Sequence, residues 1–165
     1  MTESKKKIIG IGEYIVDKNP AILVTLGLGS CVAVCLRDKR NLIGGLVHVM
    51  LPESRSSKKD EKIGKYADTG IKAIIDGIVD LGGNVKYLEA KIAGGAAMFK
   101  NSNNSLNVGA KNVEAVRQIL KENDIKIIAE DTGGNRARSV EFNISNGELK
   151  VKKVGGGEKV EITVI

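Results

Sequence analysis

The chain carries one histidine and two cysteines, and all three lie in one short stretch near its amino terminus. Cys31 and His48 are the two residues of this stretch whose side chains could do covalent chemistry together. An imidazole beside a thiol takes up the thiol proton and lowers the thiol pKa from about 8.5 to roughly 3.5–7.5, which yields a nucleophilic thiolate. Such a pair can carry out nucleophilic catalysis. The alternative is packing alone, because free cysteines are among the most often buried residues.

The two side chains can meet only if the intervening chain folds back on itself. Two apolar runs, Val32 to Leu36 and Leu42 to Val49, flank the turn-rich segment RDKRN, a pattern typical of a β-hairpin. With Asp38 to Asn41 as the loop, Cys31 lies directly opposite His48, and the Cβ atoms of such cross-strand neighbours are about 4.5–5.5 Å apart. A slip of one residue would place the two side chains on opposite faces of the sheet.

The backbone before Cys31 could complete a catalytic site. Gly27 and Gly29 allow sharp bends and a close approach to a ligand. Free N–H groups near Gly29 and Ser30 would then hold the oxyanion that forms when a nucleophile attacks a carbonyl group.

Other chemistries fit this stretch less well. In a strand, Cys31 and Cys35 are about 13 Å apart, beyond the roughly 7 Å that a disulfide allows between Cα atoms, so we expect two free thiols, with Cys35 in the core. One histidine and no Cys-x-x-Cys pair are too few soft ligands for zinc. Ser30 lies outside the G-x-S-x-G motif of serine hydrolases, and the glycines before it do not complete a dinucleotide motif. We therefore expect neither a metal nor a cofactor.

The composition indicates a folded domain with an acidic partner. With 165 residues, 42% of them apolar and 28% charged, the chain suits one domain with its own core. The net charge of +6 favours an acidic partner or substrate. It would also suit a nucleic-acid binder, but 3% aromatic residues and no Trp argue against base stacking, and no motif supports that function. No segment approaches a signal peptide or the ~20 apolar residues of a membrane span, so we expect a cytoplasmic protein without membrane insertion.

Helical periodicity appears twice along the chain. The polar segment Ser54 to Lys62 is expected to form a loop, followed by a helix that Asp60 caps and that ends at Gly82-Gly83. A second helix is expected over about Ala110 to Glu122.

Short strands account for most of the remaining pattern. Residues 8–16 are expected to form an opening strand, and Asn146-Gly147 a type I′ turn between two later strands. Further strands are expected around residues 88–92, 125–130 and 160–164. We therefore predict an α+β fold: a single domain over residues 1–165, with a mixed β-sheet core and two main helices packed on it as a layered α/β sandwich.

Six segments in series match one known family in order and spacing: TLGLGSCVAV, HVMLPES, KYADTGI, KIAGGAAMF, VGAKN and EDTGGNRARSV. By these segments, nearly the whole chain resembles the CheD chemoreceptor glutamine deamidases of bacterial and archaeal chemotaxis. The resemblance implies a cofactor-free cysteine enzyme that converts selected receptor glutamines to glutamate and releases ammonia. It also implies a catalytic triad of Cys31, His48 and Thr25, although Thr25 otherwise looks like an ordinary strand residue.

The resemblance also implies the partners. They are the cytoplasmic helices of chemoreceptors as substrate, and the CheC phosphatase as a regulator whose binding competes with that of the receptor. The same nucleophile would permit a secondary activity toward glutamate methyl esters. The alternative is an adaptor that keeps the fold and docks to CheC and receptors with little catalysis.

Overall fold

The structure is a computed structural model that describes residues 5–54, 62–98 and 107–165. Within these ranges the chain forms two five-stranded sheets, two α-helices and two short 3-10 turns, Ile63–Lys65 and Val85–Tyr87. The helices are α1 (Ala67–Asp80) and α2 (Val108–Glu122). The strands are β1 (Lys5–Ile9), β2 (Tyr14–Lys18), β3 (Ala21–Leu28), β4 (Val32–Asp38), β5 (Ile43–Val49), β6 (Leu88–Gly94), β7 (Lys126–Thr132), β8 (Ala137–Asn143), β9 (Leu149–Val154) and β10 (Glu161–Val164).

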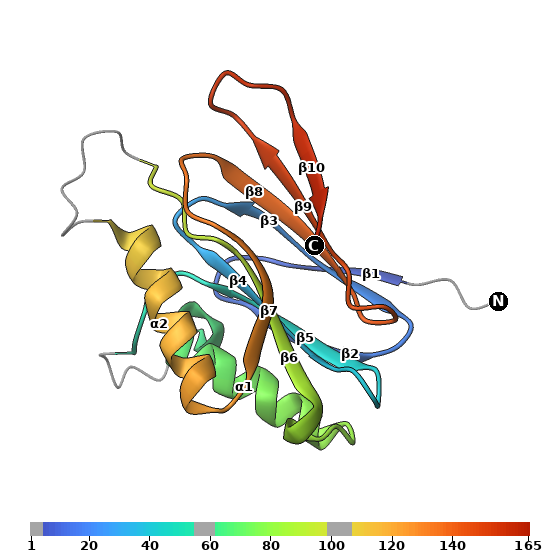
Figure 1. Ribbon diagram of the computed structural model, residues 1–165. Coiled ribbons are helices and arrows are strands. Elements are labelled where there is room, and N and C mark those ends of the chain that lie inside the picture. Colours follow the sequence, from blue (N-terminus) through green and yellow to red (C-terminus); the bar gives the residue numbers. More distant parts are fainter. Residues whose placement is uncertain (1–4, 55–61, 99–106) are drawn as a thin grey trace.

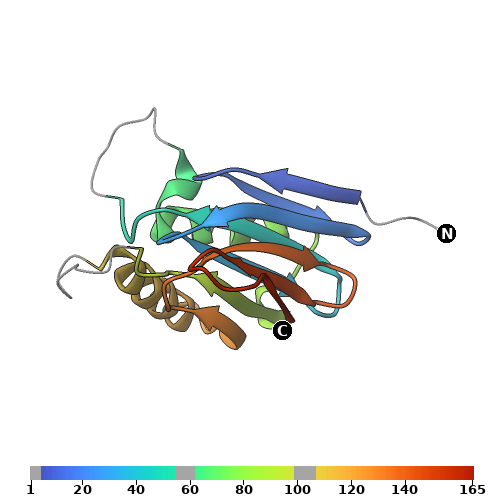
Figure 2. The ribbon, with the colours of Figure 1, turned by 90° about the horizontal axis from the view of Figure 1, so that it is seen from above.

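Sheets and helices stack in layers (Figures 1 and 2). The first sheet has the order β1-β3-β8-β9-β10 and the second β2-β5-β4-β6-β7. Each sheet is mixed, because β1 pairs with β3 and β6 with β7 in parallel while the other pairs are antiparallel. Both helices pack on the face of the second sheet that points away from the first (Figure 1). The α+β layered fold with two main helices is confirmed, and its sheet core is divided into two sheets.

Two apolar clusters fill the spaces between the layers. The cluster under the helices includes Ile74 of α1 and Leu120 of α2. The cluster between the sheets includes Phe142 of β8. Because successive strand residues point to opposite faces, β4 contributes Val34 to the first cluster and Cys35 to the second. Cys35 is fully buried, which confirms it as a core residue.

The hairpin of β4 and β5 is present, but its register differs by two residues from the predicted one. Ala33 pairs with His48, so Cys31 does not lie directly opposite His48. The loop covers residues 39–42, because Asp38 remains in the strand with its side chain buried. Its carboxylate accepts hydrogen bonds from two N–H groups of the loop, at 2.9 and 2.8 Å. The shift is even, so it does not change the face on which each side chain lies.

The predicted opening strand over residues 8–16 is two strands in different sheets. A turn over residues 10–13 separates β1 from β2. Gly12 has a φ of +76° there, a conformation that glycine adopts without steric cost. The Glu13 carboxylate closes the turn by accepting a hydrogen bond from the Gly10 N–H at 2.6 Å. The chain thereby crosses from the first sheet to the second.

Helix α1 starts later than the sequence pattern suggests. Leu51 and Tyr66 form an isolated parallel bridge, so the chain is still extended at Tyr66 and the helix begins at Ala67. Its end agrees with the prediction, because Gly82 follows the last turn with a φ of +103°. The predicted cap Asp60 lies outside the described residues.

The predicted turn at Asn146-Gly147 and the predicted loop Ser54 to Lys62 have different outcomes in the structure. Asn146-Gly147 is not a type I′ turn, because only Gly147 has a positive φ (+78°) where that turn needs two. Most of the predicted loop Ser54 to Lys62 lies outside the described residues.

Candidate active site

Thr25 and His48 come from different sheets and meet between them. Thr25 lies on β3 and His48 on β5, and both are 0% exposed. Their Oγ1 and Nδ1 atoms are 2.7 Å apart. The Thr25 hydroxyl also donates to the carbonyl oxygen of Ile9 on β1, at 2.9 Å. The structure therefore brings together two of the three residues predicted for the triad.

These contacts determine which nitrogen of His48 carries the proton. A threonine hydroxyl has one proton to donate, and the Ile9 carbonyl accepts it. The hydroxyl oxygen must then accept a hydrogen bond from Nδ1–H, which leaves Nε2 with a free lone pair. Nε2 is buried and has no hydrogen-bond partner in the described part of the chain. An imidazole held in this way is ready to accept a proton at Nε2.

The turn over residues 10–13 holds the backbone of His48. The Gly12 N–H donates to the His48 carbonyl at 2.9 Å, and the His48 N–H donates to the Glu13 carbonyl at 3.1 Å. Because Ile9 directly precedes this turn, one short segment supports both Thr25 and His48.

Cys31 lies one residue before β4 and belongs to the cluster between the sheets, on the same face as His48. It is 8% exposed, so its thiol is nearly buried. The last cross-strand pair of the hairpin is Val32 with Val49, and one further step makes His48 the diagonal neighbour of Cys31. Diagonal neighbours have Cα atoms about 7–8 Å apart and Cβ atoms somewhat closer, within reach of long or ring side chains. The predicted direct opposition is wrong, but the shared face is retained.

Residues 29–31, which we call the thiol loop, have bonded carbonyl groups and free N–H groups. None of their N–H groups donates a hydrogen bond to another described residue. Consecutive N–H groups without a partner among the described residues are the kind of donors that an oxyanion needs, and the role predicted for Gly29 and Ser30 stays a prediction. The carbonyl oxygens accept from Ala96 N–H for Gly29 (2.9 Å), from the Asn112 amide for Ser30 (2.9 Å) and from Gly95 N–H for Cys31 (2.8 Å).

Gly94 packs directly behind the thiol loop. Its φ is +114°, and a Cβ atom built on it would lie 2.2 Å from the carbonyl oxygen of Cys31. No side chain fits in that space. The close approach of the two backbones therefore depends on glycine at this position.

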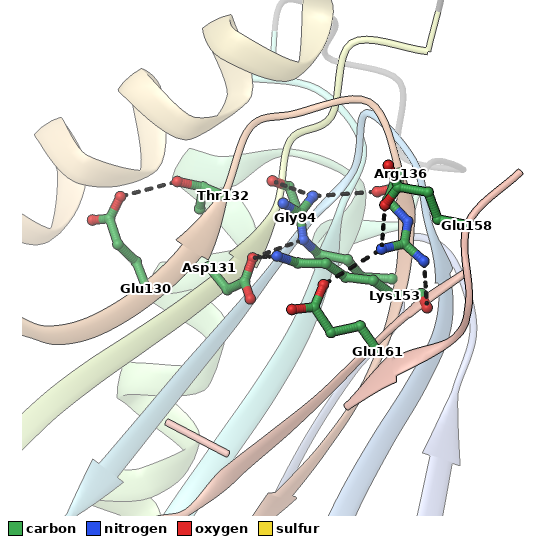
Figure 3. Close-up of polar contacts among 9 residues, drawn as sticks. Gly94, Glu130, Asp131, Thr132, Arg136, Lys153, Glu158 and Glu161 are labelled. Carbon is green, nitrogen blue, oxygen red and sulfur yellow. Dashed lines mark hydrogen bonds and ion pairs between the residues drawn. The ribbon is translucent and has the colours of Figure 1, made fainter. Parts of the chain in front are cut away.

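An ion pair between a buried arginine and a partly exposed aspartate also reaches the Gly94 carbonyl (Figure 3). Arg138 is 3% exposed; its Nε donates to the Asp131 carboxylate at 3.0 Å, and a terminal nitrogen donates to the Gly94 carbonyl at 3.4 Å. Lys153 contacts the same carboxylate at 3.2 Å. Because Arg138 is nearly buried, loss of its carboxylate partner would leave its charge unpaired, so the cluster helps to hold the Gly94 carbonyl in place.

Burial acts on both ionisable groups of the candidate site. It raises the pKa of the Cys31 thiol above its usual value and lowers the pKa of the His48 imidazole to about 4. Removal from water favours the neutral form of each group. Both shifts favour a neutral thiol and a neutral imidazole at neutral pH, unlike the thiolate that the sequence leads us to expect.

Asn112 contacts the thiol loop but was not among the predicted site residues. A signal for it exists in the sequence, because Asn112 falls on the apolar face of α2 at four-residue spacing with Val116 and Leu120. A buried polar side chain on such a face is uncommon.

Neither a metal cluster nor a membrane helix is found in the ranges that the structure describes. No three His, Cys, Asp or Glu side chains gather closely enough there to hold a metal ion. In the same ranges, no helix combines the length and the apolar character needed to cross a bilayer.

Comparison with known proteins gives one consistent family. The family model described as CheD chemotactic sensory transduction matches residues 50–153. A protein of Thermotoga maritima named chemoreceptor glutamine deamidase CheD is 59% identical over 97% of this chain and 99% of its own. A protein of Thermococcus kodakarensis named probable chemoreceptor glutamine deamidase CheD is 44% identical over 93% of this chain and 96% of its own.

Proposed function

This chain belongs to the CheD family, and from that premise we propose that it hydrolyses the side-chain amide of glutamine in chemoreceptors, releasing ammonia and leaving glutamate. Cys31 is the nucleophile, His48 the general base and acid, and Thr25 the residue that orients His48. The reaction needs no cofactor, because thiol and imidazole supply both the covalent and the proton-transfer chemistry.

One observation carries this proposal. The Thr25 hydroxyl fixes the proton of His48 on Nδ1, and Nε2, which has no hydrogen-bond partner among the described residues, lies on the face that Cys31 shares. A histidine with only a structural role would normally bond both ring nitrogens when buried, because an unpaired polar atom costs about 1–3 kcal/mol. A lone pair left free on the face that also carries a thiol is instead suited to accepting the thiol proton once the two groups meet during the reaction.

The first half of the reaction forms a thioester. As the Cys31 sulfur attacks the amide carbon, its proton passes to His48 Nε2, so charge develops only during attack. The carbonyl oxygen becomes an oxyanion, which the N–H groups of the thiol loop stabilise. His48 then returns the proton to the amide nitrogen, the C–N bond breaks and ammonia leaves.

The second half of the reaction regenerates the thiol. A water molecule loses a proton to His48 Nε2 and attacks the thioester carbon, and the C–S bond breaks with reprotonation of the sulfur. Thr25 is uncharged, so it orients the imidazole but stabilises the imidazolium less than a carboxylate would. We therefore expect modest catalytic power.

The surface around Cys31 suits a helical substrate. The exposed apolar side chains of Leu26 and Met50 follow Thr25 and His48 closely in sequence, and the exposed Met98 side chain lies against Gly29. We infer that they contact the cytoplasmic helix of a receptor, and that the net charge of +6 favours acidic receptor segments. We also propose that the protein works in the cytoplasm, that CheC binding competes with the receptor, and that glutamate methyl esters are secondary substrates of the same thiol.

The test is ammonia release from a purified receptor cytoplasmic fragment, with mass spectrometry to locate each Gln-to-Glu conversion. Cys31→Ala should abolish both signals. Cys35→Ala is the matched control, because Cys35 is a buried thiol of the same inter-sheet cluster with no proposed chemical role. The Cys35→Ala protein should deamidate the fragment at close to the wild-type rate.

Two results would reject the proposal. Activity that survives Cys31→Ala would exclude Cys31 as the nucleophile. A wild-type protein that binds the receptor fragment yet converts no glutamine would instead support the adaptor.

A further inference from the structure

Asn112 reaches the candidate site from the helical layer. Its side chain is 0% exposed, and its Nδ2 donates to the carbonyl oxygens of Ser30 at 2.9 Å and Met50 at 3.0 Å. Ser30 precedes Cys31, and Met50 follows His48 by two residues. One amide group therefore joins the two chain segments that carry the proposed nucleophile and its base.

These contacts lie just beyond the end of the hydrogen-bonded ladder between β4 and β5. The last paired residues of β4 and β5 are Val32 and Val49, so Ser30 and Met50 lie beyond the ladder. The Met50 N–H donates to the Lys65 carbonyl and not across the hairpin. The Asn112 amide thus takes over the role of a ladder bond at the end of the hairpin where Cys31 lies.

The orientation of the amide follows from its partners. Two carbonyl oxygens can be satisfied only by the NH₂ end of the side chain, which uses both of its protons. Oδ1 is then left buried, without a hydrogen-bond partner among the described residues. An apolar residue at this position would avoid the unpaired Oδ1 but would leave the Ser30 and Met50 carbonyl oxygens without this donor, so the role of the asparagine is to hold these two carbonyls.

We propose that Asn112 is a positioning residue for the reaction at Cys31. By clamping the Ser30 and Met50 carbonyls, it sets the separation between the Cys31 sulfur and His48 Nε2 and turns the N–H groups of the thiol loop toward the substrate. This inference rests on the proposed function, because it assigns Asn112 a role in the same reaction. Asn112 itself touches neither sulfur nor substrate.

The direct test is Asn112→Asp, which keeps the shape of the side chain and replaces the donor by an oxygen. We expect kcat for ammonia release to fall by about tenfold to a hundredfold with KM changed by less than about twofold, because misplaced reacting groups slow chemistry more than binding. Val116→Ala is the matched control, because it shortens a buried side chain on the same face of α2 whose apolar atoms cannot bond the Ser30 or Met50 carbonyl. It should leave kcat within about twofold of wild type.

A second readout separates positioning from general loss of structure. The rate at which iodoacetamide alkylates Cys31, followed by mass spectrometry, is measured with His48 present and with His48→Asn. If Asn112 positions the pair, His48→Asn slows alkylation in the wild type but has little effect in the Asn112→Asp background. In Asn112→Ser, which retains one hydroxyl donor, the effect of His48→Asn on the alkylation rate should lie between the effects in the wild type and in Asn112→Asp. This variant replaces Asn112→Asp if the latter does not fold.

The outcomes are distinguishable from failure of the proposed function. Equal effects of His48→Asn in both backgrounds would overturn the role of Asn112, as would kcat in Asn112→Asp close to that of Val116→Ala. If the wild type releases no ammonia, the alkylation cycle still decides whether Asn112 couples Cys31 to His48. If ammonia release depends on Cys31 but the cycle shows no coupling, only the inference on Asn112 fails.

Discussion

The charge state of His48 should leave a measurable signature in the stability of the protein. Burial lowers the pKa of its imidazole from 6.5 to about 4. Each unit of pKa shift corresponds to about 1.4 kcal/mol, so full protonation of the folded protein should destabilise it by about 3 kcal/mol relative to neutral pH. For a domain of this size that is a large part of a total stability of roughly 5–15 kcal/mol.

The sign follows from proton counting. Between pH 6.5 and about 4 the unfolded chain holds a proton on His48 that the folded protein does not hold. The contribution of His48 to stability is therefore constant well above pH 6.5 and falls as the pH decreases through this window. An imidazolium–thiolate pair would behave in the opposite way, because its raised imidazole pKa would contribute stability at low pH that is lost as the pH rises through that value. The slope distinguishes the two resting states.

Urea unfolding of the wild type and of His48→Asn, at several pH values between about 4 and 8, measures this slope. Asparagine keeps a donor for the Thr25 hydroxyl but does not titrate in this range. The lowered pKa values of Asp38 and Glu130 act in the same direction at still lower pH and cancel in the difference between the proteins. A difference that stays constant with pH, or that favours the wild type as the pH falls, would refute a buried neutral imidazole.

Two further predictions concern the groups around Cys31 and His48. Thr25→Val removes the acceptor for His48 Nδ1–H, so it should lower kcat for ammonia release by at least about tenfold and the free energy of unfolding in urea by about 2 kcal/mol. Thr25→Ser keeps the hydroxyl and should retain most of both, and equal losses in the two variants would contradict the orienting role of Thr25. Gly94→Ala should destabilise the protein by about 3 kcal/mol or more, because its Cβ would lie 2.2 Å from the Cys31 carbonyl oxygen at a φ of +114°. Gly133→Ala, with a φ of +83° but no atom within 4 Å of its Cβ, should cost only the backbone strain of about 1 kcal/mol, and matching urea midpoints would disprove the close approach at Gly94.

The hairpin shows how far local pattern reaches in this sequence. Its two apolar strands and its turn segment were predictable, because alternation and turn residues report local structure. The register was not, because Asp38 looks like a loop residue in RDKRN yet stays in the strand, where loop N–H groups satisfy its buried carboxylate. Cys31 and His48 kept a common face only because the resulting shift is two residues and side chains repeat with a period of two.

The turn over residues 10–13 marks the limit of such inference. Apolar residues continue from Ile8 to Ile11, so the pattern suggests one strand although Gly12 reverses the chain there. That reversal divides the strands between two sheets and places Ile9 against Thr25 and Gly12 against His48. These are tertiary contacts between distant segments, and no local periodicity encodes them. Thr25 was identified by resemblance to a family and not by its pattern for the same reason.

The distribution of unpaired polar atoms argues for an enzyme over an adaptor. Among the described residues three buried side-chain atoms lack hydrogen-bond partners, and two of them, His48 Nε2 and Asn112 Oδ1, belong to residues of the candidate site or its support. Each costs about 1–3 kcal/mol, and an apolar residue of similar size would avoid that cost. A protein that only docked to its partners would gain stability from such a replacement at His48, because the Thr25 hydroxyl would keep its bond to the Ile9 carbonyl and the outer surface would not change. Both unpaired atoms are explained if the lone pair on Nε2 accepts the proton of Cys31 and the amide of Asn112 keeps the thiol loop in place.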